Sequence, residues 1–331
     1  MYKMYNGIFI FITLLILLSG CTSVNKSNNV SNGKPESSEF INYNIGRNPN
    51  MFIMNSKGDT IYYKSFVTVN NERLYQGLYS KKIDGKGRKL LYNDFEGFLN
   101  VYNDLLYFTD TKGQLVELNM TSLKANIIDG NDKYHIYGPL VISDILFYNR
   151  IDNNDKCALI AYYIKEKKAI EVAQDIYWRF LSNYKDNICF LDKNRNINLW
   201  NATSKEITSY GFFDMEILQM LNDGSVIGYK NKSYIRSLNG ETSVLFEIEN
   251  MFNSIIIDNC IYVSTVDKHN YTQIFRYSLK TSKLDKIASV DFPLIGYCGK
   301  YLFCSSDSGM GDLLIVNTDN GEIKTFDDRF N

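Results

Sequence analysis

The stretch that decides the fold runs from Leu105 to Met120 and reads LLYFTDTKGQLVELNM. Apolar and polar residues alternate on both sides of a Thr-Lys-Gly turn, a pattern typical of a β-hairpin. Its first arm carries an apolar triplet centred on Tyr107, just after an Asn-Asp turn signal. The rest of the chain repeats this arrangement, and the repeat indicates the architecture.

Seven apolar triplets follow such turn signals, and the six intervals between residues 62 and 302 average 40 residues. Their centres are Tyr62, Tyr107, Phe147, Cys189, Ile227, Tyr262 and Leu302. Each triplet is followed by a strand–turn–strand pattern, at 78–91, 114–128, 158–172, 197–210, 233–246, 273–287 and 313–326. A further apolar strand precedes six of the triplets and is introduced by an aromatic residue, namely Phe95, Tyr134, Tyr177, Phe212, Phe252 and Phe292.

Three sets of features with one period of about 40 residues and four strands in each period are the signature of β-propeller blades. The sequence therefore predicts an all-β chain with a single β-propeller over residues 40–331. Seven four-stranded blades are expected, with six or eight as alternatives. The chain can close its ring with its own last strand, or residues Phe40–Ile45 can add to the edge of the last blade.

Two segments of the repeat resemble known propellers. Leu106-Tyr107-Phe108-Thr109-Asp110 resembles the YWTD repeat of lipoprotein-receptor propellers. LYSKKIDGKGRKLL (78–91) is similar to a hairpin of bacterial lipoproteins with receptor-like or TolB-like propeller domains. The resemblance implies the fold and says little about activity. Only one blade keeps the Thr-Asp, and seven blades differ from the six of the receptor type.

The N-terminus predicts a lipid anchor. An apolar run from Ile8 to Leu18 is too short to span a bilayer, which needs roughly 20 residues. It fits a secretory signal, and Leu18-Ser19-Gly20-Cys21 resembles a bacterial lipobox. Residues 1–21 are therefore expected to be a lipoprotein signal peptide, with Cys21 lipidated, and residues 22–39 a flexible tether. The expected location is the extracytoplasmic face of the cell membrane. The many Tyr, Asn, Ile and Lys residues and the few Pro residues suggest an AT-rich genome, which is consistent with a low-GC Gram-positive bacterium.

Composition excludes several classes of function. With Lys3 removed by cleavage the charges nearly balance and no basic block stands out, so no nucleic-acid partner is expected. Cysteine spacing predicts neither a disulfide framework nor a zinc site. His135 and His269 lie in different blades, and no nucleophile or phosphate-loop motif is present. No catalytic residue, metal or cofactor is therefore predicted.

The turns between second and third strands carry the candidate binding residues. They are longer in blades 1, 3, 6 and 7, at 67–73, 150–156, 265–271 and 305–312. In a propeller these turns share one face with the crossings into the next inner strand, and function tends to lie on such loops. Aromatic side chains beside Asn and Asp suit sugars or peptides. The predicted ligand-binding residues are Tyr134, Tyr177, Trp178, Arg179, His269, Tyr271 and Asp307.

Three functions remain open from the sequence. The first is a surface-tethered lipoprotein whose propeller binds a peptide, a protein or a glycan. The second is an extracytoplasmic polysaccharide hydrolase or lyase, and the third is a structural component of an envelope assembly. The scarcity of His and the missing nucleophile motifs favour the first, a protein without catalysis.

Overall fold

The structure is a computed structural model that describes residues 54–69, 72–131, 133–185, 187–257, 259–269, 271–292, 294–305 and 313–327. Positions 66–69, 72–76, 178, 179, 252, 295, 298 and 327 are described by their backbone alone. Every element of this part is a β-strand, and the 28 strands form seven antiparallel sheets of four. Among these residues, no helix is suited to crossing a bilayer.

The first four sheets are built from consecutive strands. Blade 1 contains β1 (Met54–Lys57), β2 (Thr60–Val69), β3 (Glu72–Lys82) and β4 (Lys89–Tyr92). Blade 2 contains β5 (Gly97–Tyr102), β6 (Leu105–Thr109), β7 (Leu115–Asn119) and β8 (Ala125–Asp129). Blade 3 contains β9 (Tyr134–Ile142), β10 (Ile145–Asp152), β11 (Cys157–Tyr163) and β12 (Lys168–Gln174). Blade 4 contains β13 (Ile176–Tyr184), β14 (Asn187–Asp192), β15 (Asn196–Asn201) and β16 (Ile207–Phe212).

The remaining three sheets follow the same rule. Blade 5 contains β17 (Glu216–Met220), β18 (Val226–Lys230), β19 (Ser233–Leu238) and β20 (Glu241–Glu247). Blade 6 contains β21 (Met251–Ile257), β22 (Cys260–Val266), β23 (Thr272–Ser278) and β24 (Lys283–Val290). Blade 7 contains β25 (Leu294–Cys298), β26 (Tyr301–Ser305), β27 (Leu313–Asn317) and β28 (Ile323–Asp327).

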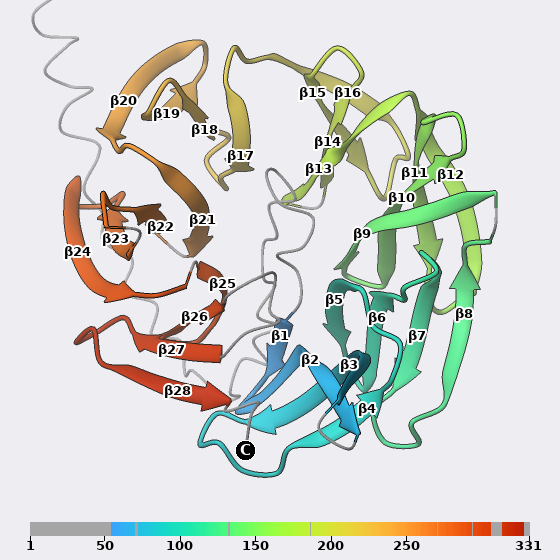
Figure 1. Cartoon of the computed structure of the whole chain (residues 1–331). Coiled ribbons are helices and arrows are strands. Elements are labelled where there is room, and N and C mark those ends of the chain that lie inside the picture. The colour runs from blue at the N-terminus through green and yellow to red at the C-terminus, as the bar shows by residue number, and fades with distance from the viewer. Residues whose placement is uncertain are drawn as a thin grey trace, which may run out of the picture. The chain divides into compact units, whose positions relative to one another are not determined.

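The seven sheets follow one another around a ring, each with its first strand innermost (Figure 1). First strands contact one another in sequence around the ring from β21 through β25, β1, β5, β9 and β13 to β17. This confirms the predicted seven-bladed, all-β propeller. The seven predicted triplets all lie on second strands, and the Tyr107 side chain is fully buried. One aromatic was misplaced, because Phe212 ends β16 and is exposed instead of opening the next strand.

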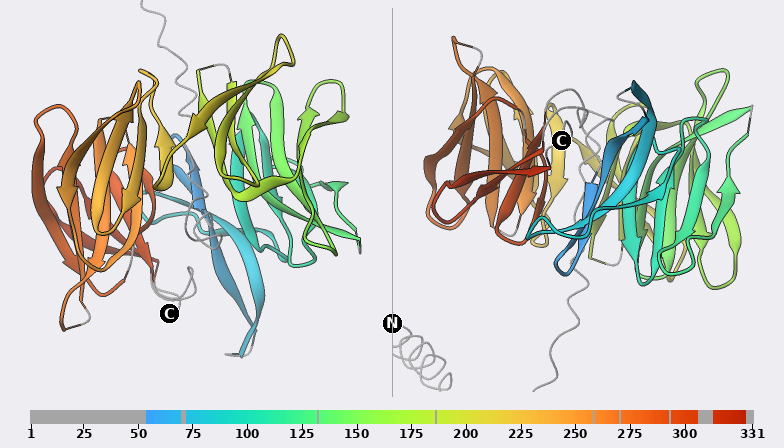
Figure 2. Two further views of the ribbon diagram at one scale, coloured as in Figure 1. Left: turned by 90° about the horizontal axis from the view of Figure 1, so that it is seen from above. Right: turned by 60° about the horizontal axis from the view of Figure 1, so that its bottom comes forward.

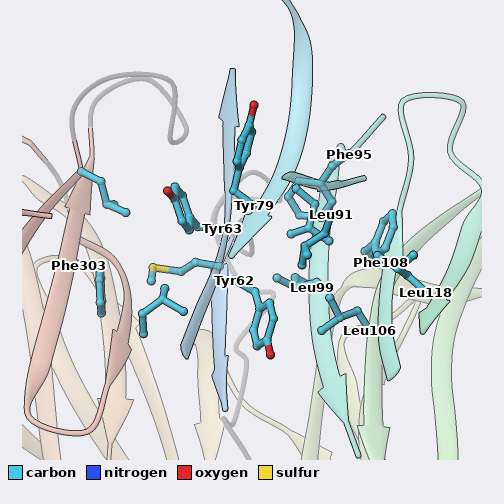
Figure 3. Close-up of a cluster of buried hydrophobic side chains, with 14 of the residues drawn as sticks. Tyr62, Tyr63, Tyr79, Leu91, Phe95, Leu99, Leu106, Phe108, Leu118 and Phe303 are labelled. Atoms are coloured by element: carbon cyan, nitrogen blue, oxygen red, sulfur yellow. The ribbon is translucent and has the colours of Figure 1, made fainter. Parts of the chain in front are cut away.

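The ring closes by side-chain packing between blades 7 and 1, because every described sheet uses four strands of its own. The Tyr63 ring meets the Phe326 ring at 5.8 Å, and Lys81 Nζ donates to the Phe326 carbonyl at 2.6 Å. Figure 3 shows the cluster around Tyr63, with Phe303 on the blade 7 side and Leu99 on the blade 2 side. The alternative closure through residues 40–45 lies outside the described residues.

Asparagine side chains on inner strands join neighbouring blades. Asn55 Nδ2 donates to the Leu99 carbonyl at 2.9 Å, and Asn100 Nδ2 donates to the Pro139 carbonyl at 2.5 Å. Asn253 bonds blade 6 to blade 7 in the same way. Buried amide groups need such partners, and each bond fixes the distance between two sheets. These bonds join blades 1 and 2, blades 2 and 3, and blades 6 and 7 at the inner ring.

Blade 1 departs from the other blades in its central hairpin. β2 and β3 have 10 and 11 residues, whereas β1 and β4 have four each. The register pairs β1 only with Thr60–Tyr63, and β4 only with Leu78–Ser80. The hairpin therefore extends past its own sheet, as the blue-to-cyan pair shows in the left view of Figure 2. The long turn predicted at 67–73 is largely paired strand.

Candidate functional site

One face of the propeller gathers the features that the sequence singled out. Tyr134 and Ile176, at the starts of inner strands, pair with Asp152 and Asp192, at the ends of second strands. The turns between second and third strands therefore lie at the same end of each blade as the crossings from the preceding blade. We call this end of the ring the crossing face. In the described residues, the turns on this face are 110–114, 153–156, 193–195, 231–232 and 267–269. Tyr271 bonds to the last of these turns through its backbone N–H.

Four of these turns share one hydrogen-bonded frame. In blades 2, 3, 4 and 6 an aspartate Oδ1 accepts the backbone N–H groups two and four residues later, at 2.8–3.0 Å. The four aspartates are Asp110, Asp152, Asp192 and Asp267. Such bonds stabilise a tight turn and fix its backbone. The residues between them, including Lys112, Asn154, Asn194, Arg195 and His269, are exposed on a fixed frame.

The hydrogen bonds and burial of these turns shift the pKa values of their aspartates. Amide hydrogen bonds from Lys156 and Asn154 lower the pKa of Asp152. Burial alone would raise the pKa of Asp192, but hydrogen bonds from Asn196 and the turn amides outweigh burial and lower it. Asp110 is the exception, because burial, helped by the nearby Asp94 charge, raises its pKa. Its residue is 3% exposed.

In blade 3 the predicted residue Tyr134 belongs to a closed unit. The Arg150 guanidinium lies over the Tyr134 ring, 4.6 Å from its centroid. Arg150 Nη2 contacts Asp129 Oδ2 at 2.5 Å, and the Tyr148 hydroxyl donates to the same oxygen at 2.5 Å. Asp129 ends β8 of blade 2, so the unit joins two blades. The Arg150 and Asp129 side chains are 29% and 11% exposed, which makes this a mostly buried ion pair.

In blade 4 the predicted residue Tyr177 carries the same cation–π arrangement. The Arg195 guanidinium lies 5.6 Å from the Tyr177 ring centroid. Arg195 has a left-handed backbone, φ 67°, and its N–H donates to the Asp192 carbonyl at 2.8 Å. Among the described residues, no carboxylate pairs with the Arg195 side chain. Tyr177 itself packs against the buried cluster of blades 4 and 5.

A β-bulge with three unpaired residues follows Tyr177. In blades 2, 3, 5, 6 and 7 the inner strand has one residue more than its partner near the crossing face. In blade 4, Tyr177 pairs with Leu191 and Leu181 pairs with Phe190, so Trp178–Phe180 are all unpaired with β14. Bulges interrupt the ladder and re-aim side chains, often beside functional sites. Phe180 is buried, whereas the side chains of Trp178 and Arg179 lie outside the described residues.

In blade 6 the predicted residues His269 and Tyr271 are exposed on the Asp267 turn. Tyr271 is 54% exposed. Both residues donate their backbone N–H to Asp267 Oδ1, and Gln273 Nε2 donates to Asp267 Oδ2 at 3.0 Å. Tyr271 is thus an exposed aromatic on a fixed turn. Asp307 lies outside the described residues.

The described predicted residues share the crossing face but belong to blades 3, 4 and 6. No described contact joins Tyr134, Tyr177 and Tyr271 to one another. Sequence analysis missed Asp129, Arg150 and Arg195. Arg150 opens the long turn 150–156 that the sequence marked, but its carboxylate partner lies in another blade. Only the spatial arrangement of the blades reveals that pair.

Three of the four cysteine side chains that the structure describes are buried in the core. Burial raises the pKa of the Cys157 thiol to about 12, and it raises the pKa values of Cys189 and Cys304 as well. A thiol of raised pKa is a poor nucleophile at neutral pH. In the described part of the chain, no group of three His, Cys, Asp or Glu side chains is arranged to hold a metal ion.

Sequence comparison finds no relative: no family model matches the chain, and no curated protein matches its sequence. Solved structures do resemble it. Oligogalacturonate lyase from Vibrio parahaemolyticus superimposes with a TM-score of 0.60 at 11% identity, over 84% of this chain and 90% of that one. The β-propeller domain of the Trilobed protease from Pyrococcus furiosus gives 0.62 at 13%, over 84% and 97%.

Puromycin hydrolase is similar over part of its length only. The TM-score is 0.61 at 13% identity, and the match covers 83% of this chain but 53% of that protein. The chain thus spans about half the length of this enzyme. Identities this low carry no argument about activity. What the three similarities support, together with the seven sheets, is that the described chain is a β-propeller.

Proposed function

We propose that the protein is a lipid-anchored binding protein whose crossing face takes a peptide, a protein or a glycan outside the cytoplasm. One observation carries the proposal. Four turns of this face are fixed by buried or hydrogen-bonded aspartates, and they present exposed polar and aromatic side chains between the bonds. A rigid scaffold with varied loop tips is the usual design of a recognition surface.

The anchor rests on the N-terminal sequence. Lipidation of Cys21 would attach the chain to the membrane, because two acyl chains suffice for stable attachment. The tether 22–39 would let the propeller reach ligands at a distance. Replacing Cys21 with Ala should release the protein from membranes or leave an uncleaved precursor. Retention of a cleaved variant on membranes, without acyl label on the wild type, would remove the anchor from the proposal.

Binding is tested with exposed residues, because their replacement leaves the core intact. Tyr271→Ala should abolish signals of the full-length protein on glycan and peptide arrays without changing its melting temperature. Ile127, 59% exposed on the outer strand β8, offers the control. Ile127→Ala removes a similarly exposed apolar group away from the turns and should keep the signals. Equal signals from Tyr271→Ala and wild type would show that the blade 6 turn takes no part.

A second candidate is a polysaccharide hydrolase or lyase, and one observation favours it. Asp110 is a buried carboxyl of raised pKa beside Asp94, and a carboxyl of this kind is suited to donate a proton to a leaving sugar. Oligogalacturonate lyase shows that the fold can carry carbohydrate chemistry. Incubation with polysaccharides, followed by an assay for cleaved products, distinguishes the two functions. Turnover by the wild type that Asp110→Asn abolishes would replace binding with catalysis. A third role, as a structural part of an envelope assembly, would be supported if neither ligand binding nor turnover is found.

A further inference from the structure

The two Arg-over-Tyr units of the crossing face differ in one component. In blade 3 the Arg150 guanidinium lies over Tyr134 and also meets the Asp129 carboxylate at 2.5 Å. In blade 4 the Arg195 guanidinium lies over Tyr177. It has no carboxylate among the described residues. A stacked guanidinium keeps its N–H edge available for a planar anion, and carboxylates match that edge in bidentate geometry.

The carboxylates nearest to Arg195 in the sequence are held by other groups. Asp192 Oδ1 accepts two turn amides at 2.9 Å, and its Oδ2 accepts Asn196 Nδ2 at 2.8 Å. Asp175 Oδ2 meets Lys193 Nζ at 3.2 Å. The hydrogen bonds keep the pKa of Asp192 low, so Asp192 is charged, and both of its oxygens already accept hydrogen bonds from its own turn and strand. Five arginine side chains are described. Three of them, Arg150, Arg236 and Arg276, have a carboxylate within 4 Å, and Arg88 bonds Ser65.

The surroundings of Arg195 suit a side-chain ligand more than an added strand. The three-residue bulge interrupts β13 beside Tyr177, so an extended peptide finds no regular ladder there. Exposed amides lie on the same turn, at Asn194, and on the corresponding turn of blade 3, at Asn154. Amides and aromatic groups are the usual partners of sugar hydroxyls and sugar faces.

We propose that Arg195, held over Tyr177, binds the carboxylate of an acidic sugar in a glycan ligand. The carboxylate of the ligand would pair with Arg195 as the Asp129 carboxylate pairs with Arg150. This inference rests on the proposed binding function and names its ligand class. The turn amides fix the backbone that carries Arg195, and the guanidinium lies over the Tyr177 ring, so part of the ordering cost of binding is met before the ligand arrives.

The test uses two probes and the full-length protein in detergent. The first probe is an oligosaccharide of uronic acid, and the second is the same oligosaccharide with its carboxyl groups reduced to alcohols. Calorimetry should show that the wild type binds the acid at least about tenfold more tightly than the reduced sugar. Arg195→Gln should remove that preference. Lys168→Gln, which takes one positive charge from the outer strand β12 away from the crossing face, should keep it.

Each outcome has a distinct meaning. If the wild type binds both sugars equally, or Arg195→Gln keeps the preference, the carboxylate subsite is wrong while the binding function stands. If an oligoglutamate peptide binds in an Arg195-dependent way and the sugar acid does not, the ligand class is wrong. If neither sugar nor any array ligand binds, the proposed function fails first, and the subsite fails with it.

Discussion

Blades 3 and 4 each place an arginine over a tyrosine near the start of their inner strand, and they use the pair differently. In blade 3 a carboxylate from blade 2 completes the unit, with Tyr148 as a second donor, so that the unit joins two sheets. In blade 4 the guanidinium remains exposed, and the strand beside it widens into a three-residue bulge. Under our proposal, the same two side chains serve stability in blade 3 and recognition in blade 4, depending on what the neighbouring blade contributes.

The largest expected effect separates these two roles through stability. Arg150→Gln removes one partner of a mostly buried ion pair and leaves the Asp129 charge without it. It should lower the free energy of unfolding by about 2–4 kcal/mol, somewhat less than for a fully buried pair. Arg195→Gln should change it by less than about 0.5 kcal/mol, as exposed substitutions do. Urea unfolding of both variants measures the difference, and equal losses would show that the comparison is false.

Trp178→Ala sharpens the role of the bulge. If the bulge presents Trp178 as a binding anchor, the variant should lose about 2 kcal/mol or more of binding free energy. Its melting temperature should stay nearly unchanged. If Trp178 instead fills space between blades, the variant should lose roughly 3–5 kcal/mol of stability. Paired titration and melting experiments distinguish the two, because only one of the quantities should move.

The pH dependence of stability should expose the blade 3 unit. Burial alone would raise the pKa of Asp129, but hydrogen bonds from Arg150, Tyr148 and the Gly130 amide outweigh burial and lower it. A carboxyl whose pKa is lowered in the folded state stabilises the fold above its unfolded pKa, near 4, and loses this contribution as pH falls through the folded value. Asp129→Asn should therefore be less stable than wild type at pH 7.

The gap between Asp129→Asn and wild type should narrow as the pH falls from about 4 towards 2. Thermal melting across that range measures it. The isosteric amide serves as its own control, because it keeps the size of the side chain and lacks the titration. A gap that stays constant from pH 7 to pH 2 would mean that the ionised form of Asp129 does not hold the unit.

The smallest expected effect concerns the pair that occupies Asp175. Lys193 and Asp175 are 66% and 59% exposed, and exposed pairs contribute about 0–1 kcal/mol. Lys193→Gln should thus leave the melting temperature nearly unchanged. It should nevertheless weaken binding of an acidic ligand slightly, because Asp175 loses its cation beside Tyr177. A large loss of stability would mean that this surface pair holds the blade 4 crossing.

The fold could be read from the sequence because its signal is local and repeated. The triplet at Tyr107, the Asp110 turn and the following hairpin are all encoded within about twenty residues, and each has counterparts one period later. The Thr-Asp of this blade has a local physical reason as well. Thr109 Oγ1 donates to the Gly97 carbonyl, and Asp110 accepts the amides of its own turn.

The candidate site could be read only in part. Turn length and aromatic content led to four predicted residues that lie exposed or half-buried on the crossing face, Tyr134, Tyr177, His269 and Tyr271, and their role in binding stays a prediction. The pairing of Arg150 with Asp129 does not follow from turn length or aromatic content, because it joins residues of two blades that only the ring brings together. The three-residue bulge after Tyr177 could not be predicted either, because strand register depends on the partner strand and leaves no pattern within β13 itself.

One measurement tests the central claim most directly: thermal unfolding of wild type, Arg150→Gln and Arg195→Gln, each with and without an acidic oligosaccharide. Ligand binding to the folded state raises the melting temperature. The account predicts that Arg150→Gln melts lower than wild type but is still stabilised by the sugar. Arg195→Gln should melt like wild type and show a smaller ligand-induced rise than wild type. A full ligand-induced rise in Arg195→Gln, or a wild-type melting temperature in Arg150→Gln, would contradict it.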